Sequence, residues 1–85
     1  MNTLIREYEM YLTTEAKLSK NTCISYVNDI TQYLDYIKKY REKHDPEDIN
    51  IEDIRSYLAS LKRNHISSTS QSRKLSAMKS FHKFL

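Results

Sequence analysis

Side chains able to contact phosphate are concentrated near the C-terminal end of the chain. Residues 65–85 carry four basic side chains and no acidic one. When residues 68–85 are projected on a helix of about 100° per residue, one side holds only hydroxyls and cations, namely Thr69, Ser72, Arg73, Ser76, Lys79, Ser80 and Lys83. Lys and Arg neutralise phosphates and release counterions, and small hydroxyls donate hydrogen bonds to phosphate oxygens. This face predicts contact with a nucleic acid, with an ordinary solvated basic face as the alternative.

A second cluster with similar chemistry lies earlier in the chain, where a helix is expected to begin at about residue 20. It combines hydroxyl, amide and ammonium groups, at Ser19, Lys20, Asn21, Thr22 and Ser25. Free backbone N–H groups at a helix N-terminus attract anions, which suits this cluster to a second phosphate contact. Simple capping of the helix explains the same residues. Because two such clusters occur in one short chain, together they favour nucleic-acid binding more than either does alone.

Other kinds of chemistry find no support in the residue types. The chain has no Gly, which excludes the glycine-rich loops that bring backbone close to a phosphate in nucleotide-binding sites. Its single cysteine excludes a disulfide framework, and Cys23, His44, His65 and His82 match no zinc-binding spacing. No arrangement of Ser, His and Asp suggests a nucleophile with its base. We therefore expect no active site, no metal, no cofactor and no small-molecule substrate.

The hydrophobic spacing that must position these clusters is helical almost throughout. Apolar residues recur at steps of three and four, which predicts helices at about residues 2–17, 20–40, 51–63 and 68–85. Pro46 ends the second of these, because proline cannot continue a helix. Four helices with short connections predict an all-α fold, a compact four-helix bundle formed by residues 1–85 as a single domain.

Local signals predict how the last two helices begin and end. Glu52 and Asp53 are expected to complement the dipole in the first turn of the third helix, and Asn64 is the best available left-handed residue after it. The run Ser68-Thr69-Ser70-Gln71 indicates a capping box that opens the fourth helix. The side of the fourth helix expected to face the core consists of Leu75, Met78, Phe81 and Leu85, with Ala77 and Phe84 at its margin.

The totals place the chain in a broad class. Its 85 residues carry a net charge of +3, and no stretch approaches the roughly 18 apolar residues that a membrane span requires. Residues 1–6 lack the apolar segment of a signal peptide, so we expect a cytoplasmic domain that contacts no membrane. The last helical pattern continues to Leu85 with no stop signal, so the chain is expected to be a piece of a longer protein.

Two segments resemble the N-terminal, SAM-like core-binding domain of tyrosine recombinases and phage integrases. Leu18-Ser19-Lys20-Asn21-Thr22, followed by Tyr26 and Asp29-Ile30, fits the family's Leu-Ser, Thr, Tyr and Asp-Leu spacing. The run from Ser70 to Lys79 fits its Arg-x-Leu-Ser-Ala-x-basic pattern. Residues 51–58 resemble the family's third helix, so the likeness covers essentially the whole chain. No single motif is very specific, but their order and spacing together are.

The resemblance implies a DNA-binding fragment of an integrase or site-specific recombinase. It implies one half of a clamp around the core recombination site in double-stranded DNA, with strand exchange performed by a separate catalytic domain that is absent here. It also implies that Tyr26 has a packing role, that the parent protein is tetrameric on DNA and that the isolated domain is monomeric. Position by position, it implies DNA contact by Lys20, Asn21, Thr22, Arg73 and Lys79. One departure from the family is that Val27 and Asn28 stand where many relatives carry basic residues, so the second helix is expected to contact less phosphate.

Two other functions remain open from the residues alone. The first is a helical protein–protein interaction module that docks a partner on a tyrosine-rich surface near Tyr8, Tyr11 and Tyr36. The second is a helix-turn-helix transcriptional regulator built from the third and fourth helices, although the usual turn glycine is missing. Salt-insensitive self-association without DNA binding would indicate the first, and a dimer on a palindromic duplex would indicate the second.

Overall fold

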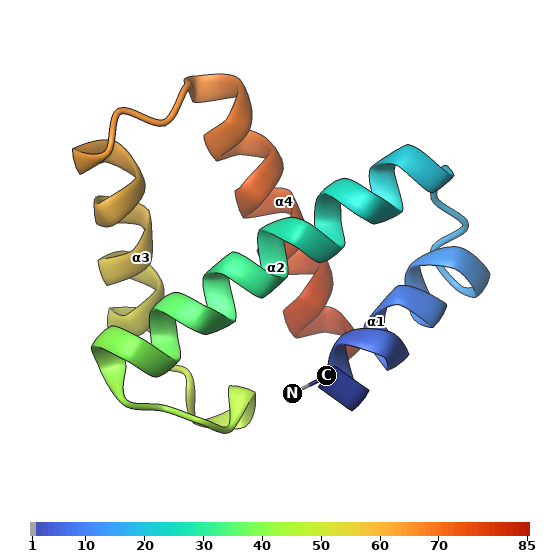
Figure 1. Ribbon diagram of the computed structural model, residues 1–85, viewed down its shortest axis with the longest axis horizontal. Coiled ribbons are helices and arrows are strands. Elements are labelled where there is room, and N and C mark those ends of the chain that lie inside the picture. Colours follow the sequence, from blue (N-terminus) through green and yellow to red (C-terminus); the bar gives the residue numbers. More distant parts are fainter. Residues whose placement is uncertain (1) are drawn as a thin grey trace.

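Four α-helices and one short 3-10 turn make up the regular structure of the computed structural model, which describes residues 2–85 (Figure 1). In chain order they are α1 (Asn2–Thr14), α2 (Lys20–Arg41), η1 (Pro46–Asp48), α3 (Ile51–Arg63) and α4 (Ser68–Phe84). No strand occurs among the described residues. The radius of gyration is 12.4 Å, close to the roughly 12 Å expected of a compact chain of this length. The prediction of a compact all-α fold is confirmed.

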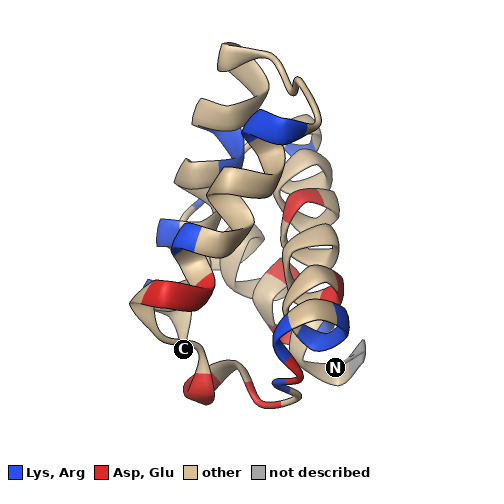
Figure 2. Ribbon diagram, turned by 90° about the vertical axis from the view of Figure 1, so that its left-hand side faces the viewer, with Lys and Arg blue, Asp and Glu red and all other residues tan. Residues whose placement is uncertain are grey.

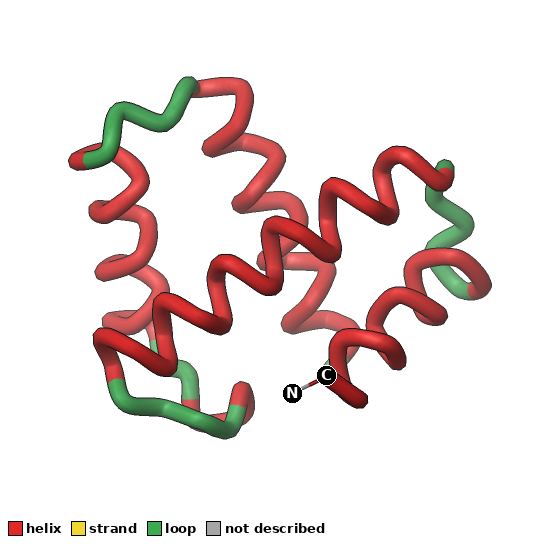
Figure 3. The backbone as a smooth tube through the Cα atoms, viewed as in Figure 1, coloured by secondary structure: helices red, strands yellow, loops and turns green. Residues whose placement is uncertain are grey.

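Helix α2 is the central element of the molecule. Figure 1 shows it running diagonally across the front, with α4 crossing behind it, α1 near its beginning and α3 near its end. The connections between helices lie at the periphery, and the longest of them, between α2 and α3, contains η1 (Figure 3). Because α2 contacts all three other helices, its side chains decide how the others are placed.

The core is built largely from aromatic rings. Tyr8, Tyr33 and Phe81 are fully buried, and the rings of Tyr8 and Phe81 meet edge to face with centroids 5.2 Å apart. The Tyr8 hydroxyl donates to the carbonyl of Ala77 over 3.3 Å, which ties α1 to α4, and burial raises the pKa of Tyr8 to about 12. Edge-to-face pairs add about 0.5–1.5 kcal/mol to the burial of the rings themselves.

Three helix ends are closed by non-glycine residues with positive φ. Lys17, Glu42 and His65 adopt φ values of 53°, 55° and 57°. Helix α1 therefore ends at Thr14 rather than at the predicted Lys17, and Leu18 N–H donates back to the carbonyl of Leu12 at 3.0 Å. The left-handed residue after α3 is His65, so the prediction of Asn64 is wrong by one position; Asn64 has φ −89° and ψ 11°. In a chain without glycine, these turns force side-chain-bearing residues into a disfavoured conformation.

Side-chain capping opens α2, α3 and α4. Ser19 accepts from Thr22 N–H at 3.3 Å, as predicted. The opening of α4 differs from the prediction, since the N-cap is Ser67, which accepts from Ser70 N–H, while Gln71 donates to the carbonyl of Ile66 instead of closing a capping box. A capping box instead opens α3, where Asn50 and Asp53 exchange backbone and side-chain hydrogen bonds.

Asp53 does more than complement the dipole of α3. Its fully buried carboxylate accepts from Asn50 N–H at 2.8 Å, from Arg41 Nε at 2.8 Å and from Lys43 Nζ at 2.5 Å. Burial alone would raise the pKa of Asp53, but these three hydrogen bonds outweigh it and lower the pKa to about 2. We call Asp53, Arg41 and Lys43 the connector cluster, because it fixes the α2–α3 connection.

The buried side of α4 is rotated relative to the prediction. Its buried residues are Lys74, Ala77, Met78 and Phe81, whereas Leu75 is only partly buried and Leu85 is 44% exposed. The apolar pattern alone pointed α4 toward Leu75 and Leu85, but α4 packs mainly on α2, which carries a buried carboxylate, Asp29, at the contact. A lysine therefore occupies a position that the hydrophobic pattern could not assign to the interior.

Candidate nucleic-acid interface

The start of α2 and the first half of α4 enclose an open groove of about 310 Å³, lined by Asn21, Thr22, Ser25, Tyr26 and Arg73. Four of these five residues were predicted site residues, and they come from two segments that are about 50 positions apart in the sequence. The fold thus brings Asn21, Thr22 and Ser25 at the start of α2 close to Arg73. The lining is rich in hydrogen-bond donors, as a surface that contacts phosphates or base edges requires.

Beneath this groove, one buried carboxylate holds two basic side chains of α4. Arg73 donates to Asp29 through Nε at 2.8 Å and through Nη2 at 2.9 Å, which makes the pair bidentate. Lys74 Nζ donates to the same carboxylate at 3.1 Å and to Gln32 Oε1 at 2.8 Å. Asp29 is only 2% exposed. We call Asp29, Arg73, Lys74 and Gln32 the groove cluster.

The groove cluster changes the electrostatic interpretation of α4. The helical projection showed a face without a carboxylate, but the fold brings Asp29 to it from α2. The hydrogen bonds from Arg73 to Asp29 raise the pKa of Arg73 further above its ordinary value. With one carboxylate shared between two cations, the cluster keeps a net charge of +1 instead of the +2 of the two α4 residues. Arg73 is therefore not the free cation that the sequence pattern suggested.

The free cations of the predicted site lie elsewhere. Lys20, Lys79 and Lys83 are exposed, and none of them forms an ion pair with any described residue. The hydroxyls predicted beside them on α4, at Thr69, Ser72 and Ser76, are exposed as well. We call Thr69, Ser72, Ser76, Lys79 and Lys83 the outer face of α4.

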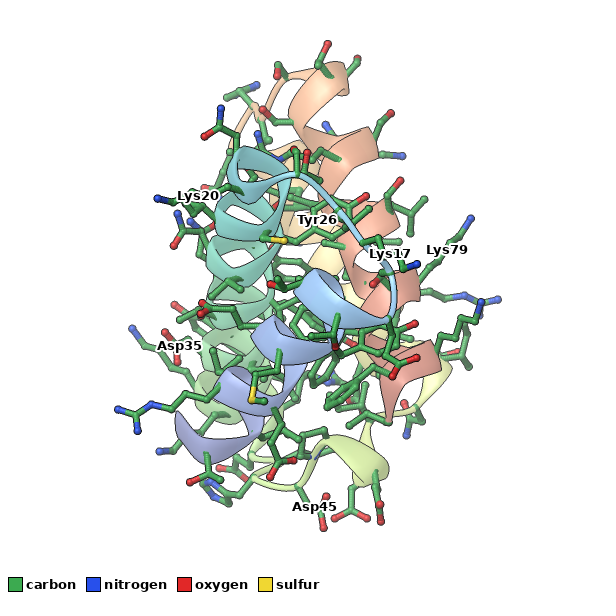
Figure 4. All side chains as sticks on the ribbon, turned by 90° about the vertical axis from the view of Figure 1, so that its right-hand side faces the viewer. Lys17, Lys20, Tyr26, Asp35, Asp45 and Lys79 are labelled. Atoms are coloured by element: carbon green, nitrogen blue, oxygen red, sulfur yellow. The ribbon has the colours of Figure 1, made fainter. Side chains whose placement is uncertain are left out.

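The predicted cations are spread around the start of α2 and along α4. Figure 4 shows Lys20 and Lys79 at opposite edges of this side of the molecule, with Tyr26 between them. The same view shows Lys17 on the connector between α1 and α2. Lys17 is exposed and forms no ion pair within residues 2–85, and the sequence reasoning missed it because it was assigned to the end of a helix.

Acidic residues gather at another part of the molecule. Figure 2 shows red segments toward the lower end, where η1 and the first turn of α3 lie. Of the acidic residues between positions 45 and 53, only Asp53 is buried, and Asp45, Glu47, Asp48 and Glu52 are exposed. Basic residues lie at this end as well, since Lys38, Lys39 and Arg41 belong to the last turn of α2, and Arg41 and Lys43 pair with Asp53. The exposed carboxylates of η1 and α3 nevertheless make this end less suited to phosphate contact than the outer face of α4.

Two further sets of residues that the sequence singled out are structural. His82 Nε2 shares a hydrogen bond with the Tyr33 hydroxyl at 2.8 Å, and burial lowers the pKa of His82. Within residues 2–85, no group of three or more His, Cys, Asp or Glu side chains could hold a metal ion.

The tyrosine-rich docking surface does not exist as predicted, because Tyr8 is fully buried while Tyr11 and Tyr36 pack against the core. None of the described helices is long and apolar enough to cross a membrane.

Comparison with known proteins connects this geometry to a family. The model of the phage integrase N-terminal SAM-like domain matches residues 5–85. Tyrosine recombinase XerD of Chlorobaculum tepidum is 40% identical over 75 residues, which cover 88% of this chain and 24% of the relative. Tyrosine recombinase XerC of Rickettsia typhi is 34% identical over 86 residues, which cover 96% of this chain and 28% of the relative. No solved structure matches the chain.

The extent of these matches defines what they show. The chain spans about a quarter of the length of the curated relatives that it matches, and nearly all of its own residues take part. The family model begins four residues after Met1 and includes all three segments that carried the resemblance. The chain belongs to the family of phage integrase N-terminal SAM-like domains, and its relatives are Xer tyrosine recombinases.

Proposed function

We propose that this chain is a DNA-binding domain of a tyrosine recombinase and clamps the duplex at the core recombination site. Strand exchange is then the work of a separate catalytic domain, and the domain described here takes no part in bond breaking. The duplex contacts the outer face of α4 and the first turns of α2, through Lys20, Asn21, Thr22 and Ser25. The isolated domain is monomeric and the full recombinase is tetrameric on DNA, in the cytoplasm.

The observation that carries this proposal is the pairing state of the exposed cations. Lys79 and Lys83 are exposed on one helix face with three hydroxyls, and neither forms an ion pair with a described residue. An unpaired lysine can neutralise a phosphate without first giving up a protein partner. Lys20 adds a third such cation beside the N-terminus of α2, whose backbone N–H groups favour anions.

Salt dependence tests the proposal. If roughly five phosphates are neutralised, the logarithm of the binding constant falls with the logarithm of salt concentration with a slope of about −4 to −5. Fluorescence anisotropy of a labelled mixed-sequence duplex, titrated with the chain at several salt concentrations, measures this slope. A slope near zero, or no binding to any duplex, would contradict the proposal.

A pair of charge reversals locates the interface. The double variant Lys79→Glu with Lys83→Glu should weaken binding strongly and make the slope less negative by about two, because each lost phosphate contact removes about one unit. The matched control is Lys38→Glu with Lys39→Glu, two exposed lysines in the last turn of α2, far along the helix from Ser19. Circular dichroism should show both variants helical. Equal loss of binding in the two variants would mean that the outer face of α4 is not the interface.

Arg73 is unsuited to the same charge reversal. Its guanidinium is hydrogen-bonded to the buried carboxylate of Asp29, so Arg73→Glu would place a second carboxylate next to a buried one. Loss of binding in that variant would not separate a lost DNA contact from a loss of stability.

A further inference from the structure

The groove cluster holds Arg73 in a way that leaves part of its guanidinium free. A guanidinium has five N–H donors, and Asp29 accepts one hydrogen bond from Nε and one from Nη2. Three donors remain, two on Nη1 and one on Nη2, and they make no hydrogen bond with a described residue. One N–H of Nη1 and the remaining N–H of Nη2 point in parallel from the end of the guanidinium. Asp29 thus occupies one edge of the fork and leaves the other available to a ligand.

Burial makes this orientation firm. The Asp29 side chain is 2% exposed, and Lys74, at 7% exposed, donates to the same carboxylate, so the anchor cannot turn toward water. The Arg73 side chain is 44% exposed and lines the groove between α2 and α4. The charged end of Arg73 is therefore accessible to a ligand, while its hydrogen bonds to the buried Asp29 fix the plane of the guanidinium.

The free end of the fork has a defined partner chemistry. Two parallel N–H groups match two adjacent acceptors, either two oxygens of one phosphate or O6 and N7 of a guanine. Asn21, Thr22 and Ser25 add amide and hydroxyl groups around the same groove. Lysine could neutralise a phosphate there equally well, but it could not present a planar pair of donors.

We infer that Asp29 is a positioning residue for DNA binding: it presents the free end of the Arg73 guanidinium to a pair of acceptors on a duplex in the groove. This inference rests on the proposed function. By its charge alone, the buried carboxylate of Asp29 opposes DNA binding. By orienting Arg73, it favours DNA binding. Asp29 itself touches no DNA.

The negative charge of Asp29 and its orienting role predict opposite changes in DNA affinity when the carboxylate is neutralised, so one substitution separates them. Asp29→Asn removes a negative charge next to the interface, so electrostatics alone predicts tighter binding. The inference predicts weaker binding by about fivefold or more, the lower range for a lost bidentate contact. The asparagine amide can accept only one of the two hydrogen bonds, and its NH2 group faces the second guanidinium donor, so the orientation set by the carboxylate is lost. Anisotropy titration of a labelled duplex measures the sign directly.

A matched control removes the same charge elsewhere. Asp53→Asn also neutralises a buried carboxylate that holds two cations, but at the connector cluster, away from the groove. It should leave DNA affinity unchanged or slightly increase it. Binding that is equal or tighter in Asp29→Asn would overturn the inference while the proposed function stands. Failure of the unsubstituted chain to bind any duplex would overturn both.

A second variant serves if Asp29→Asn fails to fold. Arg73→Lys keeps the charge and an ion pair with Asp29 but removes the planar fork, and it should weaken binding by a similar factor. Unchanged affinity in this variant would overturn the inference.

The same variant distinguishes the two kinds of acceptor. Selection from randomised duplexes, followed by sequencing, should show a guanine preference lost in Arg73→Lys, with an unchanged salt slope, if the acceptors are on a base. If they are on a phosphate, affinity falls for all sequences alike.

Discussion

The groove cluster and the connector cluster share one design and serve different purposes. In each, a buried aspartate accepts hydrogen bonds from two cations: Arg73 and Lys74 at Asp29, Arg41 and Lys43 at Asp53. The partners of Asp53 lie 12 and 10 residues away in the sequence, whereas those of Asp29 lie 44 and 45 residues away. The first cluster closes a connection locally, and the second joins the two longest helices.

Exposure of the cations is the second difference. Arg41 and Lys43 are 37% and 26% exposed, so both can turn to water if Asp53 is lost. The two cations at Asp29 differ in exposure, since the Arg73 side chain is 44% exposed and the Lys74 side chain only 7%. One cation of the groove cluster is thus committed to the interior and the other is presented at the surface. A buried carboxylate can therefore act as a fixed anchor that orients a charged group at the surface.

The largest expected effect is on stability. Asp29→Ala should lower the free energy of unfolding by about 3–5 kcal/mol, because it leaves the buried Lys74 ammonium without a counter-charge. Asp53→Ala should cost less, about 1–3 kcal/mol, mainly from the lost cap and the unpaired Asn50 N–H. Urea unfolding followed by circular dichroism measures both.

A compensating variant controls this prediction. Adding Lys74→Met to Asp29→Ala should recover much of the loss, since an apolar side chain suits a buried site that has no carboxylate. Equal losses for the two aspartates, or no recovery, would mean that the burial of Lys74 does not distinguish the clusters.

The next effect is on the pH dependence of stability. The folded pKa of Asp53 is about 2, below the ordinary value of 3.8, so the folded state binds fewer protons than the unfolded state between these values. The stabilisation is fully present above pH 3.8 and is lost as the pH falls toward 2. Thermal melts across this range should show the midpoint falling with pH, and Asp53→Asn should flatten that fall. The same acid slope in the variant would assign the effect to other carboxylates.

The smallest expected effect concerns the residue between Arg41 and Lys43. Glu42 has φ 55°, and this left-handed turn sets the direction of the chain between the two partners of Asp53. Glu42→Gly should raise the free energy of unfolding by about 0.5–1 kcal/mol, because glycine adopts this conformation without a Cβ clash but loses more freedom on folding. Glu42→Ala, which keeps the Cβ, should show no gain. A loss of stability on Glu42→Gly would mean that the glutamate side chain itself supports the turn.

Much of the fold could be predicted because its signals are local. The three- and four-residue apolar spacing predicted an all-α chain, and Ser19 caps α2 as the sequence indicated. Helix ends were less accurate where the chain turns without glycine, as at Lys17 and His65, since no residue type marks a left-handed position there. Most cations and hydroxyls of the predicted α4 face are exposed, and their contact with DNA stays a prediction. Ser80 is the exception, because it is half-buried and accepts a hydrogen bond from the core residue Tyr8 at 3.1 Å.

By itself, the sequence determined the helical class, the concentration of positive charge in residues 65–85 and the family motifs. Only the tertiary structure decided which of those charges are free. A helical projection treats α4 in isolation, and Asp29 reaches it only because α2 crosses α4. Whether a cation is paired depends on distances of about 3 Å between segments far apart in the chain, and such distances are set by packing.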